Sequence, residues 1–219
     1  MFCAVIFDWD GTLADSKNAV VASFQKVFQE SNIVVSNEFI EKRIGIGSRN
    51  LIIDALKASN VPFDDKLLNT LLNGKIEAEI ELTSMVNLFD GAIELLNSVR
   101  GKMKTALASM NNRAVIDRLL DEKGVRGYFD IVLAAEDVVK AKPDPEIFLK
   151  TALGLGCPPE KCVAMEDSIF GVKSAKAARM KCIAIPSGTY SKEELRELKP
   201  DLIVNSLKEK REILAFILG

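Results

Sequence analysis

The sequence of 219 residues contains no histidine. This absence excludes serine–histidine–aspartate and cysteine–histidine types of nucleophilic catalysis, and it excludes metal sites built on imidazole. Any residue that moves a proton in a reaction must therefore be an aspartate, glutamate, lysine, tyrosine or cysteine.

Cysteine is also scarce, and the four are Cys3, Cys157, Cys162 and Cys182. None belongs to a CxxC pair, and three lie in or beside apolar segments, so we expect buried free thiols. Free thiols fit a reducing compartment, and we expect a cytoplasmic protein.

Long apolar runs and an excess of basic charge are missing as well. No apolar run approaches the roughly 18 residues of a membrane span, and no signal peptide is expected ahead of the first apolar segment. The chain has 29 basic and 31 acidic residues, whereas nucleic-acid binders usually carry a basic excess. We therefore expect a monomer that acts on small molecules, without a membrane or nucleic-acid partner.

Short apolar segments alternate with helical patterns from about residue 88 to the end of the chain. The expected strands are 3–7, 104–108, 131–134, 162–165, 182–185 and 202–204, and the expected helices are 91–99, 113–123, 146–153, 171–178, a short one from 192 and a closing amphipathic helix. This alternation predicts a parallel sheet covered on both faces, an α/β doubly wound, Rossmann-like core.

Between the first strand and about residue 85 the periodicity is helical only. The simplest organisation is a core domain made of residues 1–15 and 85–219, interrupted by an all-helical domain at 16–84.

Polar side chains follow four of the expected strands. Asp8 and Asp10 follow the first, Ser109 the second, Lys142 lies soon after the third, and the pair Glu166–Asp167 follows the fourth. Ligands of open α/β sheets bind beyond the carboxyl ends of the strands, so we expect these side chains to meet. Taken singly, each also suits a turn, a helix cap or a solvated loop, and the functional interpretation rests on the set.

Four carboxylates and one lysine lack balancing positive charge unless a divalent cation binds. Clustered carboxylates suit Mg²⁺, and a lysine with a hydroxyl suits the oxygens of a phosphoryl group. The residues therefore predict metal-assisted phosphoryl transfer with a carboxylate as the nucleophile.

Four segments carry a resemblance to a known family: FDWDGTL (7–13), ALASMNN (106–112), KAKPDPEIF (140–148) and AMEDSIFG (164–171). In this order they resemble the four motifs of the haloacid-dehalogenase superfamily of phosphatases. The helical insert after the first motif resembles the cap of the subgroup that holds β-phosphoglucomutase, phosphoglycolate phosphatase and small sugar phosphatases.

The resemblance implies catalytic and metal-binding roles. Asp8 would be the nucleophile and a Mg²⁺ ligand, and Asp10 the general acid and base, with its backbone carbonyl facing the metal. Asp167 would bind Mg²⁺ directly, and Glu166 directly or through water. Arg179 stands where the subgroup usually has glycine, from which we expect a local difference in the turn and no change of chemistry.

The resemblance also implies a phosphate site and a substrate-reading loop. Ser109 and Lys142 would hold the phosphoryl group, together with backbone N–H groups of Trp9, Asp10 and Met110. In the cap, the segment RIGIGSR (43–49) contributes Arg43, Gly47 and Arg49 as candidates for reading the rest of the substrate, although a plain helix–helix turn is as good an interpretation.

The function predicted is that of a Mg²⁺-dependent phosphatase of small phosphorylated metabolites, with sugar or polyol phosphates favoured. A β-phosphoglucomutase-like isomerase is the main alternative, although the cap histidine of such mutases is missing. Phosphoglycolate phosphatase is disfavoured by Glu166, and phosphonoacetaldehyde hydrolase would need a Schiff-base lysine such as Lys42 or Lys57. A phospho-acceptor module or a catalytically silent binding protein are the non-enzymatic alternatives.

Overall fold

The structure, a computed structural model, describes residues 2–219 and contains one sheet of six parallel strands. The strand order is β5–β4–β1–β6–β7–β8. The strands are β1 (Ala4–Phe7), β4 (Lys104–Ala108), β5 (Ile131–Leu133), β6 (Cys162–Glu166), β7 (Lys181–Ala184) and β8 (Leu202–Ile203). All six strands were predicted, with ends displaced by at most one residue, because short buried runs between helices are a strong signal of a parallel sheet.

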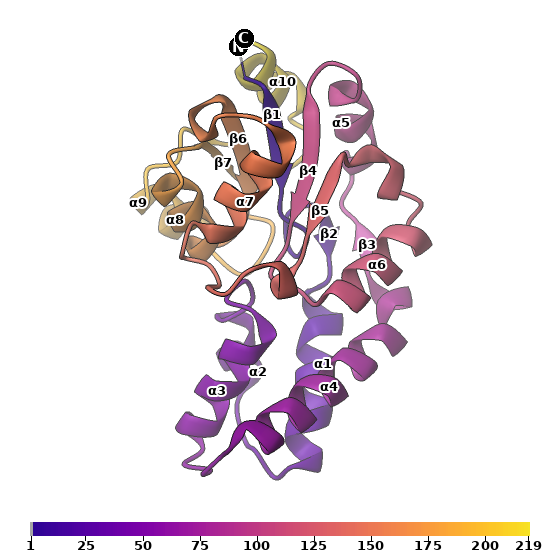
Figure 1. Cartoon of the computed structure of the whole chain (residues 1–219), viewed down its shortest axis with the longest axis vertical. Helices are drawn as coiled ribbons and strands as arrows, with labels where there is room; N and C mark the ends of the chain where they lie inside the picture. The colour runs from indigo at the N-terminus through magenta and orange to yellow at the C-terminus, as the bar shows by residue number, and fades with distance from the viewer. Residues whose placement is uncertain (1) are drawn as a thin grey trace.

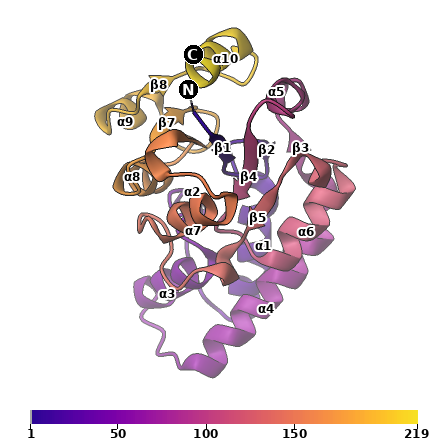
Figure 2. The ribbon, with the colours of Figure 1, turned by 45° about the horizontal axis from the view of Figure 1, so that its top comes forward.

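Alternate residues of β1 face two separate hydrophobic cores. Val5 and Phe7 pack with α5 (Ala92–Val99), α6 (Arg113–Glu122) and α10 (Lys210–Leu218). Ala4 and Ile6 pack with α7 (Glu146–Leu155), α8 (Ile169–Ala177) and α9 (Lys192–Glu197). Helices thus cover both faces of the sheet, as Figures 1 and 2 show, and the predicted doubly wound α/β fold is confirmed.

Four helices form a layer beyond one edge of the sheet, at the bottom of Figure 1. They are α1 (Lys17–Glu30), α2 (Asn37–Glu41), α3 (Ser48–Ala58) and α4 (Asp65–Glu81). The helices have a hydrophobic cluster of their own, which includes Phe24, Phe28, Ile52 and Leu71. Short 3₁₀ turns lie elsewhere at Thr83–Met85, Arg126–Tyr128, Ala135–Asp137 and Pro159–Lys161.

The chain passes between the helical layer and the α/β core at two short strands. β2 (Ala14–Asp15) and β3 (Asn87–Leu88) pair antiparallel, with Ala14 opposite Leu88. The sequence did not predict this pair, because two residues are too few to show an alternating pattern. The pair ties the entry and the exit of the helical layer together.

The prediction that all four cysteines are free thiols is wrong for two of them. Cys3, just before β1, forms a disulfide with Cys157, just after α7, with Cα atoms 6.1 Å apart. The two residues meet because α7 packs against the face of β1, and a separation of 154 residues in the chain hides this contact from the sequence. Cys162 and Cys182 are buried free thiols as predicted, so the argument for a reducing compartment rests on these two alone.

Arg179 adopts the left-handed conformation itself, with φ of +61°. Its N–H donates to Lys176 O at 2.9 Å and the next N–H, of Met180, donates to Ala175 O at 3.0 Å, which ends α8 as a glycine would. The expected difference in the turn is therefore not found; the arginine accepts the backbone strain that a glycine avoids.

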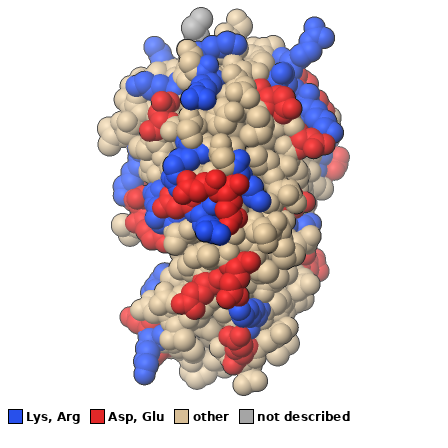
Figure 3. Space-filling model, turned by 90° about the vertical axis from the view of Figure 1, so that its right-hand side faces the viewer, with Lys and Arg blue, Asp and Glu red and all other residues tan. Residues whose placement is uncertain are grey.

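Basic and acidic side chains interleave on the face shown in Figure 3. The ion pairs of the protein include those on and beside α6, among them Arg126 with Asp121 at 2.6 Å and with Asp117 at 3.0 Å. Within residues 2–219, none of the helices combines the length and the apolar character that crossing a bilayer requires.

Candidate functional site

The carboxyl ends of β4, β1 and β6 lie side by side, because β1 pairs with both neighbours. Phe7 is in register with Leu107 of β4 and Met165 of β6. The backbone N–H of Asp8 donates to Met165 O at 3.1 Å, which extends the ladder by one step. Asp8 and Ser109 thus directly follow β1 and β4, and Glu166 is the last residue of β6, so the three lie at one edge of the sheet, as the sequence predicts.

Three carboxylates gather at this edge. Asp8, Glu166 and Asp167 each offer an oxygen within 4.8 Å of the others, and all three side chains are buried. The carboxylate of Asp10 lies outside this group.

Lys142 supplies a positive charge to the cluster. Its ammonium group donates to Asp8 Oδ1 at 2.7 Å, to Glu166 Oε1 at 2.6 Å and to Ala108 O at 3.0 Å, and its side chain is 1% exposed. Lys140, two residues earlier, is 72% exposed and pairs only loosely with Asp144. Of these two lysines, Lys142 is therefore the one that contacts the carboxylate cluster.

Glu146 anchors the loop that carries Lys142. Glu146, at the start of α7, accepts hydrogen bonds from the backbone N–H groups of Val139 and Lys140 and pairs with Lys150 at 2.7 Å. These bonds lower the pKa of Glu146 to about 2. The loop is therefore anchored on both sides of Lys142.

Glycines make room for Glu166, the last residue of β6, and for Asp167, which follows it. A Cβ at Gly11 or Gly188 would overlap Oδ2 of Asp167, and a Cβ at Gly171 would overlap the carboxylate of Glu166. Thr12 Oγ1 donates to Asp167 Oδ1 at 3.3 Å, which fixes the orientation of that carboxylate. Asp167 is thus held tightly between two loops.

Burial strongly perturbs the acids. It raises the pKa of Asp8 to about 7, against the opposing charge of Lys142, and it also raises the pKa of Asp167. The pKa of Asp10 rises to about 7, through burial first and then through the charges of Glu79 and Asp8. One lysine among three buried carboxylates leaves an excess of negative charge, and this donor set suits a hard divalent cation.

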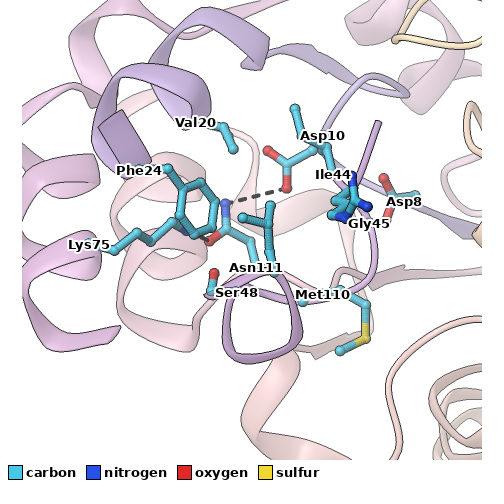
Figure 4. Close-up of a pocket in the computed structure, with 13 residues that line it drawn as sticks. Asp8, Asp10, Val20, Phe24, Ile44, Gly45, Ser48, Lys75, Met110 and Asn111 are labelled. Carbon is cyan, nitrogen blue, oxygen red and sulfur yellow. Dashed lines mark hydrogen bonds between the residues drawn. The ribbon is translucent and has the colours of Figure 1, made fainter. Parts of the chain in front are cut away.

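Asp10 turns its carboxylate away from the cluster, toward the helical layer (Figure 4). Ser16 Oγ donates to Asp10 Oδ1 at 2.6 Å, and Asn111 Nδ2 donates to Asp10 Oδ2 at 3.3 Å. Asp8 and Asp10, which only Trp9 separates in the sequence, therefore direct their carboxylates into two different environments.

A buried polar network reaches Asp10 from α4. Lys75 and Glu79 form an ion pair with side chains 2% exposed, and Asn111 bonds to both, at 3.3 Å from Lys75 Nζ and 2.7 Å from Glu79 Oε1. Sequence reasoning missed this network. Its signal is that Leu68, Leu71, Lys75, Ala78 and Glu79 form one buried helical stripe, in which the charged pair is easily taken for a solvated i,i+4 pair.

A cavity of about 30 Å³ separates Asp8 and Asp10 from the helical layer. It has room for about two water molecules. Lining residues come from the segment after β1, α1, the 43–47 loop, α3, α4 and the segment after β4: Asp8, Asp10, Val20, Phe24, Arg43, Ile44, Gly45, Gly47, Ser48, Leu51, Lys75, Met110 and Asn111. In this closed arrangement the helical layer covers the acids.

The candidates from the 43–49 segment separate in space. Arg43 and Gly47 line the cavity, and a Cβ at Gly47 would come within 3.3 Å of Met110 Cε. Arg49 points elsewhere, with its guanidinium 3.2 Å from Asp65 and its side chain 50% exposed. The structure thus brings Arg43 and Gly47, but not Arg49, to the cavity beside Asp10.

The remaining candidates lie around the strand ends. Ser109 is fully buried, and its hydroxyl accepts a hydrogen bond from Asn111 N–H at 3.0 Å. Met110 lines the cavity. The Trp9 side chain is fully buried and packs in the core, and its Nε1 has no hydrogen-bond partner within residues 2–219.

Comparisons with known proteins agree with this geometry. The model of the haloacid dehalogenase-like hydrolase family matches residues 5–185. The chain is 31% identical over 217 residues to a phosphorylated carbohydrates phosphatase of Thermotoga maritima, covering 94% of this chain and 98% of that protein. It is also 31% identical over 204 residues to Suppressor of quenching 1, chloroplastic, of Arabidopsis thaliana, of which it spans only 19%.

Among solved structures, β-phosphoglucomutase from Clostridium difficile superposes with a TM-score of 0.86 at 25% identity, covering 100% of both chains. The family match covers most of the chain and includes all four strand-end segments. The chain therefore belongs to the haloacid dehalogenase-like hydrolase family, among its phosphoric monoester hydrolases.

Proposed function

We propose that the protein is a Mg²⁺-dependent phosphatase of small phosphorylated metabolites, with sugar or polyol monophosphates as the favoured substrates. The observation that carries this proposal is that the carboxylates of Asp8 and Asp10 lie in two different environments. Asp8 lies in a buried cluster with Lys142, Glu166 and Asp167, while Asp10 faces the cavity with a pKa raised to about 7. The name of the Thermotoga relative supports phosphorylated carbohydrates as the substrate class.

In the proposed reaction an Asp8 oxygen attacks phosphorus while the ester P–O bond breaks. Asp10 gives its proton to the leaving oxygen, and an acid with a pKa near 7 suits this transfer at neutral pH. Asp10 then takes a proton from water as the water attacks the aspartyl-phosphate, which releases phosphate and restores Asp8. Ser16 and Asn111 hold the Asp10 carboxylate for both steps.

The chemistry of the donor set fits Mg²⁺. Asp8, Asp167 and Glu166 would hold the cation, with the backbone carbonyl of Asp10, and Gly11 and Gly188 leave room for the Asp167 carboxylate. When bound, the cation would balance negative charge on the carboxylates and the phosphoryl oxygens. Lys142, Ser109 and the backbone N–H groups of Trp9, Asp10 and Met110 would hold the phosphoryl group from the protein side.

Residues 16–84 would act as a cap over a core made of residues 1–15 and 85–219. A cavity of about 30 Å³ is too small for a sugar phosphate, so the helical layer must move away before substrate binds. The β2–β3 pair is the natural hinge, because both connections to the layer pass through it. On closing, the layer would exclude water and bring Arg43 and Gly47 against the leaving group.

A phosphoglucomutase-like isomerase is the second candidate function, favoured by the superposition on β-phosphoglucomutase. The missing histidine argues against it, since such mutases resemble one another in a cap histidine.

Turnover of p-nitrophenyl phosphate with Mg²⁺ tests the proposal. Asp8→Asn should lower kcat by at least about 1,000-fold, as loss of a nucleophile does. Asp121→Asn, on α6 with a side chain 66% exposed, is the matched control and should leave kcat unchanged. Absence of turnover in the wild type, or turnover that survives Asp8→Asn, would contradict the proposal. β-Glucose 1-phosphate with a bisphosphate activator tests the mutase.

A further inference from the structure

Both basic side chains that line the cavity beside Asp10 already have an anionic partner within the protein. They are Lys75 from α4 and Arg43 from the 43–47 loop between α2 and α3. A cation that is to bind an anionic part of a substrate must have unsatisfied donors directed at it, so the pairing of these two residues bears on which leaving groups the cavity accepts.

The partners of Lys75 occupy its ammonium group. It forms the buried ion pair with Glu79, donates to Asn111 Oδ1 at 3.3 Å and lies 5.0 Å from the ring centre of Phe24. Asn111 in turn donates to Glu79 Oε1 at 2.7 Å, so Glu79 is held in place from two sides. Since Lys75 and Glu79 are both buried, water screens their attraction little, and the pair is neutral as seen from the cavity.

Arg43 is occupied in a similar way. Its Nε donates to Asp54 Oδ2 at 3.2 Å, one terminal nitrogen donates to Phe39 O at 3.0 Å, and its guanidinium stacks 3.6 Å from the centre of the Phe39 ring. Its side chain is 31% exposed. The guanidinium is therefore committed to α2 and α3, not to the centre of the cavity.

The rest of the wall on the side of the helical layer is mainly apolar. Val20, Phe24, Ile44 and Leu51 line it, with Ser48 as a hydroxyl, and Asp10 and Asn111 face them from the core. A second phosphate or a carboxylate on the leaving group would meet the carboxylate of Asp10, while Lys75 and Arg43, already paired, would offer no free cation to balance it. A hydroxyl group could instead form hydrogen bonds with Ser48 or Asn111, and an apolar group could pack against the apolar side chains of this wall.

We propose that this cavity takes the uncharged part of a phosphate monoester, and that Glu79, by neutralising Lys75, excludes leaving groups that carry a second anionic group. The inference rests on the proposed phosphatase function and narrows its substrate class. Bisphosphates, pyrophosphate and phosphorylated carboxylic acids would be poor substrates, whereas monophosphates of neutral sugars and polyols would be good ones.

Matched substrate pairs test this selectivity directly. Glycerol 3-phosphate is compared with 3-phosphoglycerate, and fructose 1-phosphate with fructose 1,6-bisphosphate, by kcat/KM for phosphate release in Mg²⁺. The substrate whose leaving group is uncharged, called here the neutral member of each pair, should have a kcat/KM at least tenfold higher than that of the substrate with a second anionic group, the anionic member. Glu79→Gln keeps the shape of the side chain but removes its charge, and it should shift the ratio by at least tenfold toward the anionic member.

The control variant is Glu81→Gln, on the same helix, whose side chain is 67% exposed and pairs with Lys26; its ratio should equal that of the wild type. The double variant Lys75→Met with Glu79→Leu removes the whole ion pair and should keep the preference for the neutral member, which covers the case in which Glu79→Gln does not fold.

The inference is overturned if the wild type has a ratio of kcat/KM below tenfold between the neutral and the anionic member, or if Glu79→Gln has the same ratio as the wild type. In either case, turnover of p-nitrophenyl phosphate would still support the phosphatase function. Absence of turnover with every ester overturns both.

Discussion

The ammonium group of Lys142 lies 2.7 Å from Oδ1 of Asp8, although 134 residues separate them along the chain. The loop after β5 brings the lysine to the end of β1, where the same nitrogen also contacts Glu166 at 2.6 Å. The contact is almost fully buried, and the two carboxylates raise the pKa of Lys142 and keep it charged. One residue thereby neutralises part of the site and holds the proposed nucleophile in position.

Replacing Lys142 by methionine should damage both activity and stability. Loss of a buried partner leaves carboxylates uncompensated and costs about 3–5 kcal/mol in the free energy of unfolding. Loss of a donor to the phosphoryl oxygens should lower kcat about 100- to 1,000-fold. Urea unfolding and turnover of p-nitrophenyl phosphate measure the two effects. Lys140→Met, at an exposed position of the same loop, is the control, and equal behaviour of the two variants would contradict the assignment.

Gly188→Ala should weaken the binding of Mg²⁺, because a Cβ there would overlap Oδ2 of Asp167 and push that carboxylate aside. Changes beside a metal ligand typically cost about 10- to 100-fold in metal affinity. A Mg²⁺ titration of activity measures the shift. Gly127→Ala is the control, since its Cβ would meet nothing within 4 Å. An unchanged Mg²⁺ dependence in Gly188→Ala would argue that Asp167 is not a ligand.

The stability of the protein in EDTA should fall as pH rises from 5 to 8. The pKa values of Asp8 and Asp10 rise to about 7 in the folded state, from about 3.9 in an unfolded chain. Between these values the folded state holds protons that the unfolded chain releases. The stability from these groups is therefore complete below about pH 4 and is lost as the pH rises through about 7.

Mg²⁺ requires ionised carboxylates, so it should raise the Tm more at pH 8 than at pH 5. Thermal unfolding with EDTA or with Mg²⁺ across this range measures both trends. Glu146 and Glu194, whose pKa values are lowered to about 2, titrate below this pH window and do not disturb the measurement. A Tm that rises with pH in EDTA would show that the acids are not desolvated as described.

Thiol counting tests the disulfide. The protein unfolded without reductant should react with a thiol reagent at two positions, Cys162 and Cys182, and at four positions after reduction. In the folded protein both free thiols should react slowly, because burial raises the pKa of each. Four reactive thiols in the unfolded, unreduced protein would show that Cys3 and Cys157 are not bonded.

The local character of each segment was readable from the sequence alone. Apolar runs of four or five residues and helical periodicity predict the strands and helices, since side-chain spacing reports which face of an element is buried. The position of Asp8, Ser109 and Glu166 after three such strands predicts that they meet, because parallel strands end at one edge of the sheet.

Only the tertiary structure decided which groups contact one another across elements. In the fold, Cys3 is bonded to Cys157, and Arg49 pairs with Asp65 and does not line the cavity. Lys75 and Glu79 are buried together beside Asn111. Nothing local distinguishes these from other cysteines and charged pairs, because burial of a polar group depends on what another part of the chain places over it. The proposed reaction thus follows from the residues at the ends of the strands, whereas the proposed selectivity for an uncharged leaving group follows only from how the helical layer packs over them.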